Sequence, residues 1–258
     1  MIKALIFDVD GTLAETERDG HRVAFNRAFA EAGLKWVWDV PLYGELLAIT
    51  GGKERIRHFI DTHQPAFPPQ ADEAAFIAGL HKAKTAHYLK LLAEGGIPLR
   101  PGVRRLLGEA RTRGVRLAIA TTTTPENVTG LLEATLGAEA IGWFEVIGAG
   151  DIVPKKKPAG DIYTWVLEQM RLEPSECLAF EDSANGVRAA VEAGIPVLVT
   201  DNSYTAHDDF TGALAVLSDL GDPSQPVTVQ RGPIPASGFV DCAYLQQLHA
   251  LAQGNPTG

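Results

Sequence analysis

The chain has 258 residues, of which 45% are hydrophobic and 21% are charged. This length suits one large core, or one core that carries a smaller inserted unit, and the composition excludes a disordered chain and a disulfide-dense secreted domain. A net charge of −9 argues against nucleic acid or an anionic membrane surface as a partner. The two cysteines, Cys177 and Cys242, predict no disulfide framework, and an amino terminus that reaches Asp8 early predicts no signal peptide, so we expect a cytoplasmic protein.

The first part of the chain changes from strand to helix. Residues 2–7 are an apolar run that ends abruptly at Asp8, which predicts a buried strand. The segment 16–92 shows only helical periodicity, with breaks at Gly33 and at 65–69. We therefore expect an all-helical unit of the four-helix type to be inserted directly after the first strand.

Beyond Gly95-Gly96, apolar strands alternate with amphipathic helices. The expected strands are 115–120, 144–147, 177–180 and 196–199, and the expected helices are 103–113, 126–136, 159–171 and 184–193. Such alternation predicts an α/β fold with a Rossmann-like parallel sheet covered on both faces. Residues 200–258 give weaker patterns: a strand near 214–217, an apolar segment at 226–230 and a last helix at 240–252. The expected organisation is a core formed by 1–15 and 93–258, with 16–92 as the helical insert.

Charge is distributed unevenly between these two parts. The segment 16–92 has ten Lys/Arg, nine Asp/Glu and five of the seven histidines, so that the rest of the chain carries a net charge of −10. An acidic body with a slightly basic insert suits a small anionic ligand held between them. A random scatter of surface charges explains the same numbers equally well.

Ion-binding side chains follow four of the expected strands. They are Asp8 and Asp10 after the first strand, Thr121 after 115–120, Lys157 in the loop after 144–147, and Glu181 and Asp182 after 177–180. Ligands of open α/β sheets bind beyond the carboxyl ends of the strands, so these groups are expected to converge at one edge. Clustered carboxylates repel one another unless a cation neutralises them, and Mg²⁺ prefers oxygen ligands.

A phosphoryl group would be the natural partner of a lysine and a threonine beside such a cation. We expect Asp8 to act as the nucleophile and Asp10, two residues further along, to move protons. Lys157 and Thr121 would bind the phosphoryl oxygens through the transition state. The four strand ends together predict a phosphoryl-transfer site.

These residues resemble the four ordered motifs of the haloacid dehalogenase superfamily. The motifs are Asp8-Val9-Asp10-Gly11-Thr12, Thr121, Lys157-Pro158 and Glu181-Asp182, and the resemblance covers roughly 1–14 and 95–205. It implies an aspartyl-phosphate intermediate and a Mg²⁺ ion held by Asp8, the backbone carbonyl of Asp10, and Asp182, with Glu181 as a supporting acid. The second aspartate is typical of the superfamily's phosphatases and mutases, which argues against a dehalogenase.

The helical insert lies where this superfamily places its first type of cap, and parts of it resemble the CbbY-type branch. Those parts are 15–17, 36–39, 50–56 and 81–85, together with 120–123 and 156–158 in the core. The branch includes xylulose-1,5-bisphosphate phosphatases, which remove an inhibitor of Rubisco, the carbon-fixing enzyme of the Calvin cycle. The resemblance implies substrate contacts by Glu17, Tyr43, Gly51, Gly52, Lys53, Glu54, Arg55, His81, Lys82, Lys84, Thr121, Thr122 and Thr123.

The main hypothesis is therefore a Mg²⁺-dependent sugar-phosphate phosphatase, a phosphoric monoester hydrolase that converts xylulose 1,5-bisphosphate into xylulose 5-phosphate. A β-phosphoglucomutase-like mutase and a phosphatase of broad specificity stay open, because no motif decides where the phosphate goes. A small anionic sugar phosphate or bisphosphate is the expected partner, and the chain is expected to be a monomer.

Two further expectations concern individual side chains. Three lysines, 155–157, precede Pro158, and we expect Lys157 rather than its neighbours to enter the site. The remaining cap histidines show no metal-ligand grouping, so a structural or surface role is expected for each of them. They are His21, His58, His63 and His87.

Overall fold

The computed structural model describes residues 1–254; the last four residues of the expected core lie outside the described residues. Its centre is a seven-stranded sheet in the order β3-β2-β1-β4-β5-β6-β7. The strands are β1 (Ala4–Phe7), β2 (Arg116–Ala120), β3 (Phe144–Gly148), β4 (Cys177–Glu181), β5 (Val197–Thr200), β6 (Ala215–Leu217) and β7 (Val229–Arg231). The first six are parallel, which confirms the predicted Rossmann-like fold.

The apolar segment predicted at 226–230 contributes to an antiparallel edge strand. β7 pairs with β6 in the antiparallel sense. A parallel return needs a crossover of about a dozen residues or more, usually with a helix, and the connection over 218–228 contains no helix.

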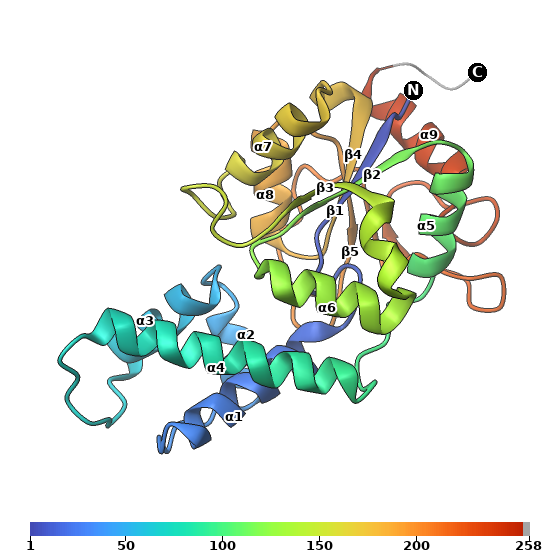
Figure 1. Cartoon of the computed structure of the whole chain (residues 1–258). Helices are drawn as coiled ribbons and strands as arrows, with labels where there is room; N and C mark the ends of the chain where they lie inside the picture. The colour runs from blue at the N-terminus through green and yellow to red at the C-terminus, as the bar shows by residue number, and fades with distance from the viewer. Residues whose placement is uncertain (255–258) are drawn as a thin grey trace.

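Helices cover both faces of the sheet (Figure 1). One apolar layer includes side chains of α5 (Val103–Thr112), α6 (Pro125–Leu136) and α9 (Cys242–Ala252), and the other includes those of α7 (Asp161–Met170) and α8 (Ala184–Glu192). Two 3₁₀ turns, η2 (Ala138–Trp143) and η3 (Pro174–Glu176), precede β3 and β4. Leu5 of β1 faces the first layer and Ile6 the second, which explains why the strand is apolar at every position.

The segment between β1 and α5 forms the helical unit that we call the cap. It contains the π-helical turn η1 (Glu17–His21) and the helices α1 (Arg22–Glu31), α2 (Val40–Leu46), α3 (Gly52–His63) and α4 (Glu73–Ala93). Two aspartates start helices there, since the side chain of Asp39 accepts from the Leu42 amide at the start of α2 and Asp72 does the same for the Ala75 amide of α4.

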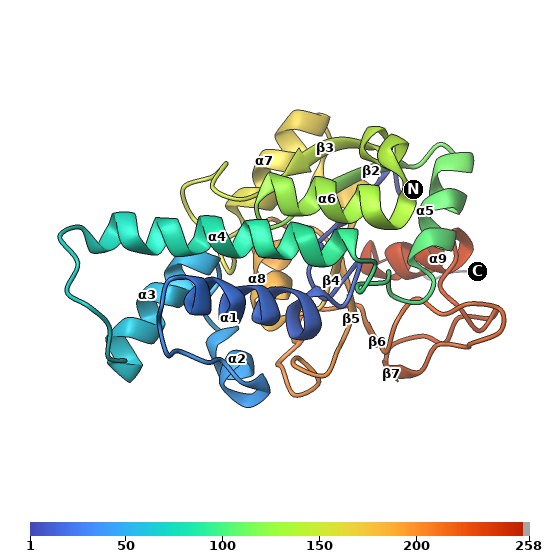
Figure 2. The ribbon, with the colours of Figure 1, turned by 60° about the horizontal axis from the view of Figure 1, so that its bottom comes forward.

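Aromatic side chains form the centre of the cap. The ring of Trp38 lies 4.7 Å from that of Phe25 and 4.9 Å from that of Phe29, centroid to centroid. This cluster is separate from the two layers of the sheet. α4 runs alongside both α1 and α6, which places the cap against one end of the core (Figures 1 and 2).

The segment after residue 220 belongs to the core. Tyr244, Leu245 and Leu248 of α9 are buried in the same layer as α5, and the Cys242 amide donates to Glu109 of that helix. Among the described residues, no helix is both long enough and apolar enough to cross a bilayer.

Candidate active site

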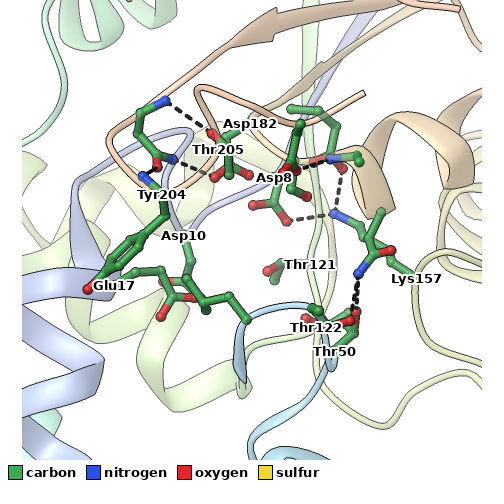
Figure 3. Close-up of a pocket in the computed structure, with 18 of the residues that line it drawn as sticks. Asp8, Asp10, Glu17, Thr50, Thr121, Thr122, Lys157, Asp182, Tyr204 and Thr205 are labelled. Carbon is green, nitrogen blue, oxygen red and sulfur yellow. Dashed lines mark hydrogen bonds and ion pairs between the residues drawn. The ribbon is translucent and has the colours of Figure 1, made fainter. Parts of the chain in front are cut away.

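Two adjoining cavities lie where the strand ends meet the cap. The larger has a volume of about 280 Å³ and is lined by residues of both parts (Figure 3). The smaller, of about 40 Å³, is lined mainly by cap residues and by the loop 122–124. Asp10, Glu17, Arg55 and Thr122 line both, so the two cavities meet along these side chains.

Three carboxylates form the floor of the larger cavity. One oxygen each from Asp8, Glu181 and Asp182 lies within 4.8 Å of the others, and all three side chains are buried. Burial raises the pKa of Asp8 to about 7, with Glu181 adding to the rise and Lys157 opposing it. Burial and the neighbouring carboxylates also raise the pKa of Asp182 well above its usual range, although the Asn202 amide donates to its Oδ2 at 2.7 Å. The three carboxylates therefore carry more negative charge than Lys157 neutralises.

Lys157 is the lysine that enters the site. Its Nζ donates to Asp8 Oδ1 and to Glu181 Oε1, both at 2.6 Å, and the Tyr163 hydroxyl donates to the same Glu181 oxygen at 2.6 Å. Burial favours the neutral amine, but Asp8 and Glu181 outweigh it and raise the pKa of Lys157. Lys155 is exposed and Lys156 bonds elsewhere.

Two glycines allow the acidic groups to approach the backbone. A Cβ atom at Gly11, where φ is +81°, would lie 2.1 Å from Asp182 Oδ2. At Gly186 it would lie 1.7 Å from Glu181 Oε2. The glycine of the first motif is thus required by contact as well as by backbone conformation.

Thr121 lies at the end of β2, beside Lys157 in the wall of the larger cavity. Its amide donates to the Gly148 carbonyl at 2.9 Å, and its hydroxyl accepts from the Thr123 amide at 3.3 Å. Because α6 begins only at Pro125, the intervening loop is free to line both cavities.

The Asp10 side chain is held by residues of the cap. Its Oδ1 accepts from the Thr16 hydroxyl at 2.5 Å and from His21 Nε2 at 2.8 Å, while Lys84 donates to His21 Nδ1 at 2.9 Å. Burial raises the pKa of Asp10, but His21 and Thr16 outweigh it and hold this pKa well below its usual range. His21, for which a structural or surface role is expected, is buried, and its position four residues before Phe25 on the inward helix face brings the ring to a core carboxylate.

Glu17 and Arg55 are oriented by Tyr43. The Tyr43 hydroxyl donates to the Glu17 carboxylate and accepts from Arg55 at 3.1 Å. Tyr43 is fully buried and lines neither cavity, whereas Glu17 and Arg55 line both. Burial raises the pKa of Tyr43 well above its usual value, so the hydroxyl keeps its proton.

The smaller cavity gathers several of the predicted substrate contacts. They are Gly51, Gly52, Arg55, His81, Lys84, Thr122 and Thr123. Burial, with Lys84 as the next cause, lowers the pKa of His81 to about 4. Burial also lowers the pKa of Lys84, to about 8, against the opposing effect of Asp10. A Cβ at Gly52 would lie 2.5 Å from the His81 ring, which accounts for this glycine.

Besides Tyr43, three predicted contacts line neither cavity: Lys53, Glu54 and Lys82. Lys82 is exposed because it lies two residues, or about 200° of helix rotation, from the buried Lys84. Lys53 and Glu54 form ion pairs with Asp151 and Lys156 of the core.

Several residues that line the larger cavity are not among the predicted ones. They are Ser183, Ala184, Asn185 and Arg188 at the start of α8, and Asn202, Tyr204, Thr205 and Asp208 after β5. The loop after β5 could have been found, because the strand-end rule that selects Asp8 applies equally there. Buried Arg100 gives no such signal, yet it donates to the carbonyls of Gly11, Asp201 and Ser218 and so ties three strand-end loops together.

Comparison with known proteins agrees with the motifs. The family model described as haloacid dehalogenase-like hydrolase matches residues 2–194. The plasmid-borne CbbY protein of Cupriavidus necator is 50% identical over 248 residues, which are 96% of this chain and 97% of that protein.

Solved structures of CbbY from Rhodobacter sphaeroides resemble this one. The complex with phosphate superposes with a TM-score of 0.80 at 47% identity, covering 85% of this chain and 95% of that chain. A mutant of the same protein in complex with xylulose 1,5-bisphosphate gives the same values. The chain thus belongs to the haloacid dehalogenase-like hydrolases and, within them, to the CbbY-type sugar phosphatases, which are phosphoric monoester hydrolases.

Proposed function

We propose that this phosphatase removes the 1-phosphate of xylulose 1,5-bisphosphate, giving xylulose 5-phosphate, in a Mg²⁺-dependent reaction through an aspartyl phosphate. The observation that carries the proposal is the pair of joined cavities. The larger has a buried lysine among carboxylates, and the smaller is lined by Arg55, His81 and Lys84. A substrate with a phosphate at each end matches that arrangement, and the CbbY complex described above supports the choice of sugar.

The donor set of the larger cavity fits a hard divalent cation. One oxygen of each of the three carboxylates lies within 4.8 Å of the others, and Glu181 Oε2 is buried without a hydrogen-bond partner among residues 1–254. We propose Asp8, the backbone carbonyl of Asp10 and Asp182 as ligands of Mg²⁺, with Glu181 as a supporting acid. When bound, the ion neutralises the like charges and polarises the phosphoryl group.

The side chains then divide the reaction into two displacements. An Asp8 oxygen attacks phosphorus while the bond to the sugar oxygen breaks. Asp10, in its protonated form, gives that oxygen a proton; because His21 and Thr16 hold the pKa of Asp10 low, the protonated form is a strong acid. Water next attacks the phosphorus of the phosphoaspartate, Asp10 takes its proton, and inorganic phosphate leaves. Lys157 and Thr121 hold the phosphoryl oxygens that do not react.

The smaller cavity is the proposed site of the second phosphate. Arg55 and Lys84 supply positive charge there, and the Thr122 amide and the hydroxyls of Thr122 and Thr123 supply donors. Glu17 lines both cavities, so it is placed to accept from a sugar hydroxyl. Tyr43 acts on the substrate through Glu17 and Arg55.

We also propose that the chain divides into a core of 1–15 and 93–258 and a cap of 16–92. Separate apolar clusters support this division, although α4 extends one residue past it, to Ala93. We further propose that the chain acts as a monomer.

Phosphate release with Mg²⁺ tests the proposed function. The substrates are xylulose 1,5-bisphosphate, ribulose 1,5-bisphosphate and β-glucose 1-phosphate, with Asp8→Asn as the control. A strong preference for the xylulose compound, lost in the variant, is expected. Comparable slow release from all three would instead define a phosphatase of broad specificity, and conversion of β-glucose 1-phosphate into glucose 6-phosphate would define a mutase.

A further inference from the structure

Four charged side chains alternate in sign where the cap meets the core. Lys53 Nζ donates to Asp151 Oδ2 at 2.6 Å, and Lys156 Nζ lies 2.9 Å from Asp151 Oδ1 and 2.8 Å from Glu54 Oε1. Lys53 and Glu54 begin α3 of the cap, whereas Asp151 and Lys156 lie in the core loop between β3 and α7. Two of the three ion pairs therefore join the cap to the core.

Gly51 is shaped to this network. Its φ is +98°, and a Cβ there would lie 2.2 Å from Glu54 Oε2 and 2.8 Å from Lys156 Nζ. A side chain at this position would separate the Glu54–Lys156 pair. The lack of a side chain at Gly51 therefore leaves room for the Glu54–Lys156 pair.

The network holds one end of a loop whose other end is also fixed by the core. Asn185 of α8 donates to the Thr50 hydroxyl at 3.1 Å and to the Ala48 carbonyl at 3.2 Å. The segment 50–55 runs from the Thr50 contact through Gly51 into the first turn of α3, where Lys53 and Glu54 form the network. It carries Thr50 into the larger cavity and Arg55 into both.

We propose that a cap latch holds the segment 50–55 over the core. The latch consists of four positioning residues: Lys53, Glu54, Asp151 and Lys156. Lys53 and Glu54 act on the core and not on the substrate. The proposal rests on the proposed function only in taking the two cavities as the substrate site. Lys156 directly precedes Lys157, so closure of the cap and the position of the buried lysine depend on one short stretch of chain.

The latch side chains are partly exposed. This exposure suits ion pairs that break each time the cap opens in the catalytic cycle. The side chains of Asp151 and Glu54 are 57% and 44% exposed, whereas that of Lys156 is 15% exposed. Exposed ion pairs are weak one by one and are screened by salt. Their sum can favour the closed cap without preventing the release of products.

Neutralising Asp151 breaks two of the three pairs without touching either cavity. We expect Asp151→Asn to lower kcat/KM for the bisphosphate about threefold to tenfold, and Asp151→Glu to restore most of it. Glu145→Gln is the matched control, because Glu145 is 48% exposed and pairs with Arg116 inside the core. Equal activity of Asp151→Asn and Glu145→Gln, or no recovery in Asp151→Glu, would overturn the proposal.

A charge inversion separates a latch from direct contact with substrate. The variant Lys53→Glu, Glu54→Lys, Asp151→Lys, Lys156→Glu keeps the alternation of signs along the network. We expect its kcat/KM to exceed that of Lys53→Glu alone by about threefold or more, because the pairs are re-formed. If Lys53 bound the distal phosphate, the inverted enzyme would be no better than the single variant, and the latch would be rejected.

Hydrogen exchange in the substrate-free enzyme tests the latch without reference to any substrate. Amides of 50–55 should exchange faster in Asp151→Asn than in Glu145→Gln, by about threefold or more, while amides of β1 are unchanged. Unchanged exchange at 50–55 would reject the latch even in an active enzyme. Faster exchange in an enzyme that ignores xylulose 1,5-bisphosphate would support the latch and reject the proposed substrate.

Discussion

The site has a core half and a cap half. Strand pairing positions the core half, whereas helix phase and contacts to the core position the cap half. In the core, Phe7 of β1 is paired with Ile119 of β2 and with Phe180 of β4, so the strands end side by side. Asp8 and Glu181 are the residues that follow the paired phenylalanines. Sheet register alone therefore brings residues more than 170 positions apart into one cluster.

The cap half depends on helix phase and on contacts that reach across to the core. Lys82 and Lys84 differ in position by two residues, yet only Lys84 is buried. Lys84 reaches Asp10 through His21, and Asp10 belongs to the core. Variants of core residues should therefore lose the chemical step. Variants of cap residues should instead misorient groups of the site or weaken substrate binding.

The largest effect is expected in the core. Asp8→Asn should lower kcat by at least about a thousandfold, because an amide cannot form the phospho-enzyme. The melting temperature should not fall, since an amide oxygen can still accept from Lys157 in place of the Asp8 Oδ1 atom. Phosphate release and thermal unfolding, measured on one preparation, check both parts. Residual activity within about tenfold of the parent would place the nucleophile elsewhere.

A cap residue that acts on a core carboxylate should give the next effect. His21→Ala leaves Asp10 with only the Thr16 hydroxyl as a partner. We expect kcat to fall about tenfold to a hundredfold with little change in KM, in the lower range for a general acid–base group, and His21→Gln to recover part of the loss. Steady-state kinetics, with His58→Ala as the control, provide the measurement. A change in KM alone would mean that His21 serves binding and not Asp10.

This difference between the two halves also explains which features of the fold and of the site could be predicted from the sequence. The order of strands and helices, the apolar layers and the four strand-end groups follow from periodicity and from the rule that ligands lie beyond strand ends. The choice of Lys157 among three lysines follows from the Lys-Pro motif, whereas its partners, and the pairing of His21 with Asp10, do not follow from the sequence, because they depend on how distant segments pack. The same is true of Lys53 and Glu54, whose motif is evident in the sequence while their partners in the loop 149–160 are not.

The two lysines of α4 offer a matched pair within the cap. Lys84→Met should lower kcat/KM for the bisphosphate about tenfold or more, because a buried cation beside the smaller cavity is lost. Lys82→Met should stay within about twofold, since surface substitutions change little. Kinetics with a monophosphate of the same sugar extend the comparison, and the Lys84 effect should be smaller there. Equal losses in the two variants would mean that helix phase does not govern the cap half.

The smallest effect concerns the pH dependence of stability and is carried by His81. Its pKa is lowered to about 4, chiefly by burial and next by Lys84, so the folded chain binds fewer protons than the unfolded chain between pH 4 and 6.5. The free energy of unfolding therefore falls as the pH decreases through this window. After allowance for the partial exposure of the ring, the contribution is about 1–2 kcal/mol, or a few degrees in melting temperature.

His81→Gln removes the imidazole that binds this proton, so the free energy of unfolding should depend less on pH. The difference in melting temperature between the variant and the parent should shift in favour of the variant as the pH falls from 7 to 5. The exposed control His63→Gln should show no such trend. An identical difference from the parent at both pH values would show that the His81 ring takes up protons as readily in the folded chain as in the unfolded one. Neither burial nor Lys84 would then act on the ring, and the electrostatic environment described for the smaller cavity, on which the phosphate-binding role of the cap half rests, would be rejected.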